Sequence, residues 1–329
     1  MIRSPYPWFG GKSTVAGVVW QRLGDVRNFV EPFFGSGAMT LARPHWPFDD
    51  TQNRIETVND KDGFVANFWR ALNTAPDEVY EWCNWPVNEA DLHARHFWLV
   101  NSEHSRTLLR RLKDDPEHYD AKVAGWWVWG ICQWIGSGWC HHPEWQQLPH
   151  LGNAGRGIHR PSQQLPHLGN AGRGDELHDY IHLLADRMRR VRVCCGDWSR
   201  VCGPTPTVKQ GLTGVFLDPP YNADAERDGD LYAVDDLSIW NDDREWCKEF
   251  GNDKRIRICL AGYAGEGHEE LESLGWTVLE WKARGGYGSQ SDGEETNGRE
   301  NAKKERLWFS PHCIGVKKSR GLFDTLASN

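Results

Sequence analysis

The sequence predicts an α/β fold, with a mostly parallel sheet covered by helices on both faces. Three observations support this prediction. Short runs rich in Val, Ile and Phe alternate with segments of helical period at both ends of the chain. A glycine-rich turn follows the first of these runs directly. Near the C-terminus, residues 277–281 and 306–310 flank a polar, glycine-rich segment, and we expect them to close the sheet as an antiparallel hairpin.

Two strands and two helices are expected in the first 75 residues. Residues 28–33 form a short strand, and the turn from Gly35 to Gly37 leads into a helix that must end before Pro44. Residues 56–60 form the second strand. A longer helix follows from about residue 62, because apolar side chains recur on one face at Phe64, Phe68 and Leu72.

The same alternation resumes in the last third of the chain. Residues 191–195, 214–218 and 255–260 have strand patterns, and a helical segment near 237–250 lies between the last two. Strands that are joined through helices pair in parallel, because the crossover returns the chain to the starting edge of the sheet. We therefore predict that residues 1–75 and 191–329 form one domain around a single sheet.

The middle of the chain is different and is predicted to be an inserted domain, residues 76–190, made mainly of helices and loops. Helical patterns at 105–113 and 175–190 surround a segment that is very rich in tryptophan, 126–139. The sequence QQLPHLGNAGRG then occurs twice, starting at Gln146 and at Gln163. Two copies are too few for a solenoid, which needs at least three stacked units. The repeat is either a duplicated surface loop or a pair of arms that each carry one arginine.

The composition is that of an ordinary globular protein. Hydrophobic residues make up 39% of the 329 residues, and most of the 19 tryptophans are expected in the core or at its rim. No apolar run reaches the roughly 20 residues of a membrane span, and the N-terminus lacks a signal-peptide pattern. Nine scattered cysteines without a CxxC pair indicate no disulfide framework. These features predict a cytoplasmic protein.

No metal site is expected from the sequence. The nearest approach to a ligand set is Cys132, Cys140, His141 and His142, but the gap between the two cysteines is long for the usual ligand spacing.

The net charge of −8 argues against nucleic-acid binding, because affinity for DNA depends on neutralising phosphates. The distribution of charge weakens this objection. Between residues 122 and 174 the only acidic residue is Glu144. The basic residues of that segment are Lys122, Arg156, Arg160 and Arg173. We expect the three arginines to contact DNA.

The segment from Glu31 to Gly37, Glu-Pro-Phe-Phe-Gly-Ser-Gly, points to a cofactor that contains adenosine. A glycine turn after a strand lets the backbone approach a nucleotide closely, and an acid at the end of the next strand, here Asp60, can accept hydrogen bonds from ribose hydroxyls. A dinucleotide fingerprint would need a third glycine where Thr40 stands, which disfavours a dehydrogenase.

The sequence Asp218-Pro219-Pro220-Tyr221 follows a predicted strand and suits chemistry at an aromatic amine. Such an amine is a poor nucleophile because its lone pair is delocalised into the ring. A carboxylate that accepts one N–H and a backbone carbonyl, that of Pro219, that accepts the other can aim the lone pair. The consecutive prolines preorganise the turn, and Tyr221 can stack on the base, which is worth roughly 1–3 kcal/mol in such contacts.

The order of these motifs resembles that of the Dam-type (D12 class) DNA adenine methyltransferases. That family has a Trp-x-Gly-Gly-Lys segment, then Glu-Pro-Phe-x-Gly-x-Gly, an acid after the next strand, a recognition domain, and finally Asp-Pro-Pro-Tyr. All of these occur here in that order, and the resemblance covers both ends of the chain. It implies a Rossmann-like S-adenosylmethionine-dependent methyltransferase fold in which residues 76–190 are the DNA target-recognition domain.

The resemblance also implies roles for individual residues, with S-adenosyl-L-methionine as cofactor. Asp218 would lie between the cofactor and the target base. Asp197, which ends the sequence Cys194-Cys-Gly-Asp, resembles the family's acid near the cofactor adenine. Residues of three motifs would contact the cofactor: Trp8, Gly10, Gly11, Lys12, Glu31, Pro32, Phe33, Gly35, Ser36, Gly37 and Asp60.

The implied reaction is transfer of a methyl group to N6 of an adenine that is flipped out of double-stranded DNA in a bacterial or phage-infected cell. N4 of cytosine offers the same two N–H groups to the tetrapeptide and is the alternative, followed by an RNA adenine or a protein-glutamine methyltransferase. Family members that read GATC tend to carry a basic residue where Pro7 stands. The recognition sequence, a cognate restriction endonuclease and the oligomeric state are therefore left open.

Overall fold

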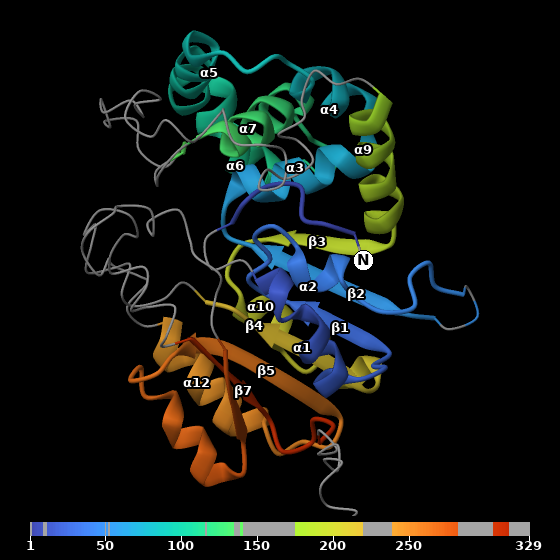
Figure 1. The fold of residues 1–329 in the computed structure, drawn as a ribbon, viewed down its shortest axis with the longest axis vertical. Coiled ribbons are helices and arrows are strands. Elements are labelled where there is room, and N and C mark those ends of the chain that lie inside the picture. The colour runs from blue at the N-terminus through green and yellow to red at the C-terminus, as the bar shows by residue number, and fades with distance from the viewer. Residues whose placement is uncertain are drawn as a thin grey trace, which may run out of the picture.

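A computed structural model describes residues 2–8, 12–49, 51, 53–115, 117–134, 139–140, 175–219, 239–281 and 305–315. Within them, seven strands form one sheet in the order β3-β2-β1-β4-β5-β7-β6 (Figure 1). The first five along the chain pair in parallel, whereas β7 runs antiparallel to both β5 and β6. The strands are β1 (Asn28–Glu31), β2 (Ile55–Asp60), β3 (Val191–Cys195), β4 (Thr213–Leu217), β5 (Ile256–Tyr263), β6 (Thr277–Glu280) and β7 (Glu305–Phe309).

The predicted mixed α/β fold with a mostly parallel sheet and a closing antiparallel pair is confirmed. Strands β1 and β4 are buried along their whole length, as expected for central parallel strands covered on both faces. Two strand boundaries differ from the predicted ones by two residues or more. Strand β1 ends at Glu31, because Pro32 has no N–H to continue the ladder. Strand β5 runs on to Tyr263, which pairs with Glu305 of the antiparallel neighbour.

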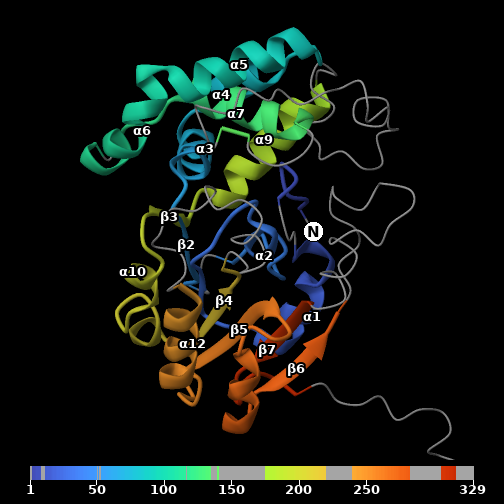
Figure 2. The same ribbon diagram turned by 90° about the vertical axis from the view of Figure 1, so that its left-hand side faces the viewer.

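Helices cover the two faces of the sheet separately. Helix α1 (Ala16–Leu23) packs on one face against Phe29 and Phe216, and the short α2 (Ala38–Leu41) contributes Met39 to the same cluster. On the other face, α10 (Ser199–Cys202) and α12 (Ile239–Phe250) pack against β4 and β5. Figure 2 shows α10 and α12 on one side and α1 on the other. Short 3-10 turns complete the described elements: η1 (Lys12–Thr14), η4 (Val208–Gln210) and η6 (His268–Leu274).

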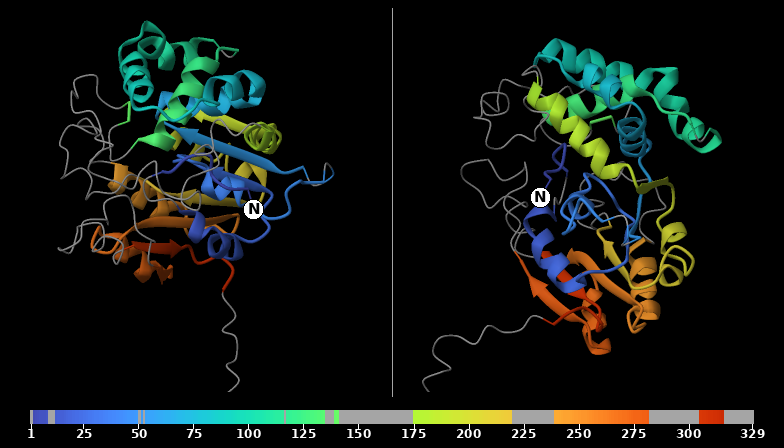
Figure 3. Two further views of the ribbon diagram at one scale, coloured as in Figure 1. Left: turned by 45° about the horizontal axis from the view of Figure 1, so that its top comes forward. Right: turned by 90° about the vertical axis from the view of Figure 1, so that its right-hand side faces the viewer.

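A layer of helices stands beyond the β3 edge of the sheet (Figures 1 and 3). One hydrophobic cluster extends from Val58 of β2 and Val191 of β3 through all of these helices. Helix α6 confirms the helical pattern at 105–113, and α9 confirms the one at 175–190. The layer comprises α3 (Gly63–Thr74), α4 (Pro76–Cys83), α5 (Glu89–Asn101), α6 (Glu103–Asp114), α7 (Ala121–Gln133) and α9 (Asp175–Met188).

The first part of the tryptophan-rich segment is a buried helix. Helix α7 begins after Asp120, whose carboxylate accepts a hydrogen bond from Val123 N at 2.9 Å. Among the described tryptophans, Trp85 is 40% exposed. Most of the others lie in the core or are partly buried at its rim, as the composition predicted. The buried set is Trp20, Trp69, Trp127, Trp129, Trp134, Trp139, Trp198, Trp276 and Trp308.

A buried charge network fixes α9 to the sheet. The guanidinium of Arg187 donates to both carboxylate oxygens of Glu56, at 2.8 and 2.7 Å, and to the carbonyl oxygen of Thr40 at 2.5 Å. Arg43 lies 3.1 Å from the same Glu56 carboxylate. The last turn of α9 is therefore tied to β2 and α2 together.

In the described part of the chain, no helix combines the length and apolar character needed to cross a membrane. The duplicated sequence at 146–157 and 163–174 lies outside the described residues, and so do residues 282–304 of the polar, glycine-rich segment before β7.

Candidate active site

The candidate site lies at the edge of the sheet where the parallel strands end. The strand order reverses between β1 and β4, and open α/β sheets bind ligands in the crevice at such a switch point. Glu31 ends β1 and Asp60 ends β2. Asp218 follows β4 directly, and Glu305 begins the antiparallel β7, which places it at the same edge. Four carboxyl groups thus gather at one edge.

The glycine turn after β1 is held from several sides. Gly35 has φ +46°. Its N–H donates a hydrogen bond to Oδ2 of Asp60 at 2.8 Å, and its carbonyl oxygen accepts a hydrogen bond from the Tyr6 hydroxyl at 2.8 Å. The indole of Trp8 lies against it so closely that a Cβ atom at Gly35 would clash with the ring. Any side chain would therefore be strained and obstructed, which explains the glycine. The turn is tied to the end of β2 and to the N-terminal segment.

Asp60 is half-buried, and both of its carboxylate oxygens accept backbone hydrogen bonds. Oδ2 accepts from Gly35 N, and Oδ1 accepts from Asp62 N at 2.9 Å. Burial, with a contribution from the negative charge of Asp62, raises the pKa of Asp60 to about 7. Each oxygen keeps a second lone pair that can accept a ligand hydroxyl. The residue is thus fixed in position by the turn that it supports.

Asn59 joins the loops after β1 and β3. Its buried side-chain amide donates to the carbonyl oxygens of Pro32 and Gly196, both at 3.0 Å. Gly196 N in turn donates to Asp60 O at 3.0 Å. The next residue, Asp197, is exposed and accepts a hydrogen bond from Ser199 N at 2.9 Å. The segment that carries Asp197 is therefore positioned beside Asp60.

The ring of Phe33, in the turn after β1, lies 5.9 Å between centroids from that of Trp198, which follows β3. The two aromatic side chains thus join the turn after β1 to the segment that carries Asp197.

Glu31 is buried and holds α2 against β1. Its Oε2 accepts hydrogen bonds from the backbone N–H of Thr40 at 3.0 Å and from the Thr40 hydroxyl at 2.6 Å. Burial raises the pKa of Glu31 to about 8; the bonds from Thr40 oppose this rise and the charge of Asp218 adds to it. The helix begins after Gly37, which has φ +73°. Glu31 thus holds the end of the turn that leads into α2, whereas Asp60 holds the turn at Gly35.

Lys12 and Asp218 form the charged centre of the site. The ammonium group of Lys12 is buried and lies 3.0 Å from Oδ1 of Asp218 and 3.9 Å from Oε2 of Glu305. The side chain of Asp218 is 20% exposed, so it also faces solvent. Burial raises the pKa of Glu305 to about 7; Lys12 lowers this pKa and Asp218 raises it. One cation therefore lies next to two carboxyl groups.

Residues 8–111 match the model of the D12 class N6 adenine-specific DNA methyltransferases. The match covers 104 of the 329 residues, and over that segment the predicted resemblance to the family is confirmed. The match includes Trp8, the glycine turn and Asp60, and it runs on through α4, α5 and most of α6, past the expected domain boundary at residue 75. Asp218 lies beyond it. A search of curated proteins gave no match.

The fold brings several predicted site residues to one edge of the sheet. Ser36 is buried within the turn, and Pro219 is buried beside Asp218. Seven predicted residues lie outside the described part of the chain: Gly10, Gly11, Arg156, Arg160, Arg173, Pro220 and Tyr221.

Three residues of the candidate site were not predicted. Tyr6 and Asn59 hold the glycine turn, and Glu305 shares Lys12 with Asp218. A signal for Glu305 was present in the sequence: an acid at the start of an antiparallel strand reaches the edge where the parallel strands end. Tyr6 had no comparable signal, because its partner is a backbone carbonyl.

Proposed function

We propose that this adenine methyltransferase binds S-adenosylmethionine at the β1–β4 switch point and uses Asp218 to hold the amine of the target adenine. The observation that carries the proposal is the Lys12–Asp218 ion pair at the carboxyl edge of β4, next to the glycine turn of β1. It supplies an ionised acceptor beside a backbone turn suited to a nucleotide.

The cofactor fits the residues present. Asp60 and the Trp8 indole fix the turn at Gly35, and Asp60 has lone pairs for ribose hydroxyls. The half-buried ring of Phe33, which packs against Trp198, offers apolar surface near Asp197 for an adenine. When bound, S-adenosylmethionine supplies a methyl group that is already activated as a sulfonium. The protein therefore needs neither a metal nor a cysteine nucleophile for transfer, and positioning is its main task.

Asp218 accepts one N–H of the amine, and the carbonyl oxygen of Pro219 accepts the other. This directs the nitrogen lone pair away from the ring system. Lys12 stabilises the ionised carboxylate of Asp218, which would otherwise face two further carboxyl groups. With a pKa of about 8, Glu31 is mostly protonated at neutral pH and adds little negative charge. Tyr221 stacks on the flipped base.

The helical and loop region at 76–190 is proposed to recognise DNA, with Arg156, Arg160 and Arg173 as phosphate or groove contacts. The target base must leave the duplex, because its amine is inaccessible to the sulfonium while the base is stacked and paired. An A·T pair costs less to open than a G·C pair.

The proposal is tested by titrating S-adenosylmethionine into the wild type, Asp60→Ala and Asp218→Ala in a calorimeter, followed by a methyl-transfer assay on duplex DNA. Asp60→Ala should weaken cofactor binding at least about tenfold, because the turn and the ribose lose one carboxylate. Asp218→Ala should bind the cofactor within a few-fold of wild type yet transfer no methyl group. Equal cofactor affinity of Asp60→Ala and wild type would reject the site.

A further inference from the structure

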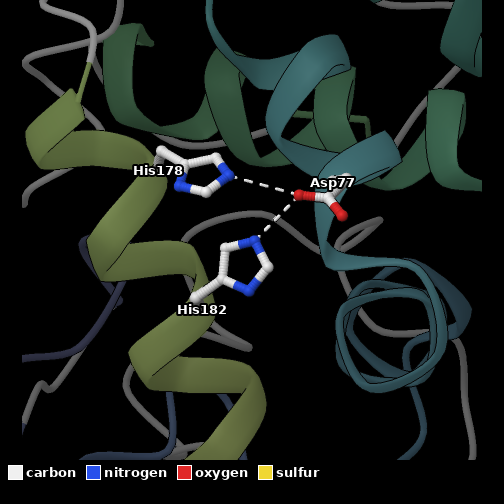
Figure 4. Close-up of side chains that lie close together, drawn as sticks. All are labelled: Asp77, His178 and His182. Atoms are coloured by element: carbon white, nitrogen blue, oxygen red, sulfur yellow. Dashed lines mark hydrogen bonds and ion pairs between the residues drawn. The ribbon is translucent and has the colours of Figure 1, made fainter.

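A separate cluster of side chains that can ligate a metal lies in the helical layer, away from the sheet edge. Asp77 stands in the first turn of α4, and His178 and His182 are on α9. Residues four apart share one helical face, so both imidazoles point the same way. Figure 4 shows the two rings directed at the Asp77 carboxylate across the gap between the helices.

The geometry suits a metal ion. Oδ1 of Asp77 lies 2.8 Å from Nε2 of His182 and 3.2 Å from Nε2 of His178, and the three ligand atoms lie within 4.8 Å of one another. A tetrahedral Zn²⁺ ion with bonds of about 2.0–2.2 Å holds neighbouring ligand atoms roughly 3.3–3.5 Å apart. Small side-chain rotations would reach that spacing without moving either helix.

We propose that Asp77, His178 and His182 bind a divalent transition-metal ion of the Zn²⁺ type. Two imidazoles and one carboxylate are ligands of matching softness for such an ion. The side chains are 39–73% exposed, so solvent can supply water for the fourth position.

The ion would link two helices where the predicted insertion joins the rest of the chain. Asp77 is the second residue of the 76–190 region, and α9 leads out of it into β3. The edge of the Tyr80 ring already packs on His178, so the two helices are in contact at this point. Binding of the ion would tie the first and last helices of the region together.

Zn²⁺ alone is the probe, with dialysed full-length protein and bound metal counted by atomic emission after gel filtration. The double variant His178→Gln/His182→Gln should bind one Zn²⁺ ion fewer than wild type, and Asp77→Asn should weaken that site at least about tenfold. The matched control is His104→Gln. His104 is an exposed histidine 3.2 Å from Asp120, it belongs to no group of three possible ligands among the described residues, and its loss should leave the Zn²⁺ count unchanged.

Two further readouts separate this site from adventitious binding. Co²⁺ should give visible absorption bands in wild type that the double variant lacks, without the near-ultraviolet charge transfer that cysteine ligands would add. Zn²⁺ should slow hydrogen exchange of α4 and α9 in wild type but not in the double variant. The proposal is overturned if the double variant binds as many Zn²⁺ ions as wild type, or if exchange in these helices does not respond to Zn²⁺.

Discussion

The ammonium group of Lys12 lies 3.0 Å from the carboxylate of Asp218, joining the N-terminal segment to the end of β4. Both residues belong to motifs of the sequence, but their contact is visible only in the fold. Oε2 of Glu305 lies 3.9 Å from the same ammonium group. The lysine therefore lies near two carboxyl groups, and we propose that it keeps Asp218 available as an acceptor at the switch point.

Lys12→Met should lower the methyl-transfer rate about 100-fold, because Asp218 would lose its neighbouring cation beside Glu305. Lys12→Arg should retain part of the activity, and Lys209→Met, at an exposed lysine, should behave as wild type. A wild-type rate of methyl transfer in Lys12→Met would show that the lysine does not act on Asp218.

Gly35→Ala should destabilise the fold by about 2 kcal/mol, because the residue has a positive φ and its Cβ would meet the Trp8 indole. Cofactor affinity should fall as well, since the turn must shift. Gly17→Ala is the matched control. Gly17 lies in α1 with open space around it, and alanine there should stabilise the helix by roughly 0.5–1 kcal/mol. Urea denaturation and calorimetry measure both effects; equal stability of Gly35→Ala and wild type would contradict this account.

Glu31→Gln should reduce the pH dependence of stability. The pKa of Glu31 is raised from 4.5 to about 8, so the folded protein binds a proton that the unfolded chain releases. This contribution to stability is fully present below about pH 4.5 and is lost as the pH rises towards 8. Denaturation curves between pH 5 and 8 should therefore show a smaller decline for Glu31→Gln than for wild type. Glu272→Gln, at an exposed carboxylate, should leave the slope unchanged.

Arg187→Met should cost about 3 kcal/mol of unfolding free energy, because Glu56 would lose a buried two-point partner. Arg43 still contacts Glu56 in this variant, so the loss of unfolding free energy should be at the low end of the range for buried ion pairs. The control is Arg189→Met, whose side chain pairs with Asp186 at the surface and is 77% exposed. That substitution should change the unfolding free energy by no more than about 0.5 kcal/mol. Similar losses in the two variants would mean that the Glu56 network contributes little.

Local signals predicted most of the sheet and much of its functional edge. Asp60 and Asp218 each come at the end of an apolar run, so their place at the carboxyl edge follows from the strand alone. The glycine turn was predicted from an equally local signal. The domain boundaries and the roles of the site residues stay predictions.

What the sequence did not predict depends on contacts between distant segments. The Lys12–Asp218 and Arg187–Glu56 pairs join residues far apart in the chain. Helix α7 is apolar on most of its surface, with buried residues from Ala121 to Gln133, so it lacks the one-sided period by which helices are recognised. The pairing of His178 and His182 with Asp77 depends on how α4 packs against α9.

The most direct test of the account is the chemical identity of its product and its dependence on Asp218. Duplex DNA incubated with S-adenosylmethionine and either wild type or Asp218→Ala is digested to nucleosides, and the methylated nucleoside is identified by mass. The account predicts N6-methyladenine from wild type, and none from an Asp218→Ala protein that is folded and still binds the cofactor. N4-methylcytosine as the sole product, or near-normal formation of N6-methyladenine by Asp218→Ala, would contradict it.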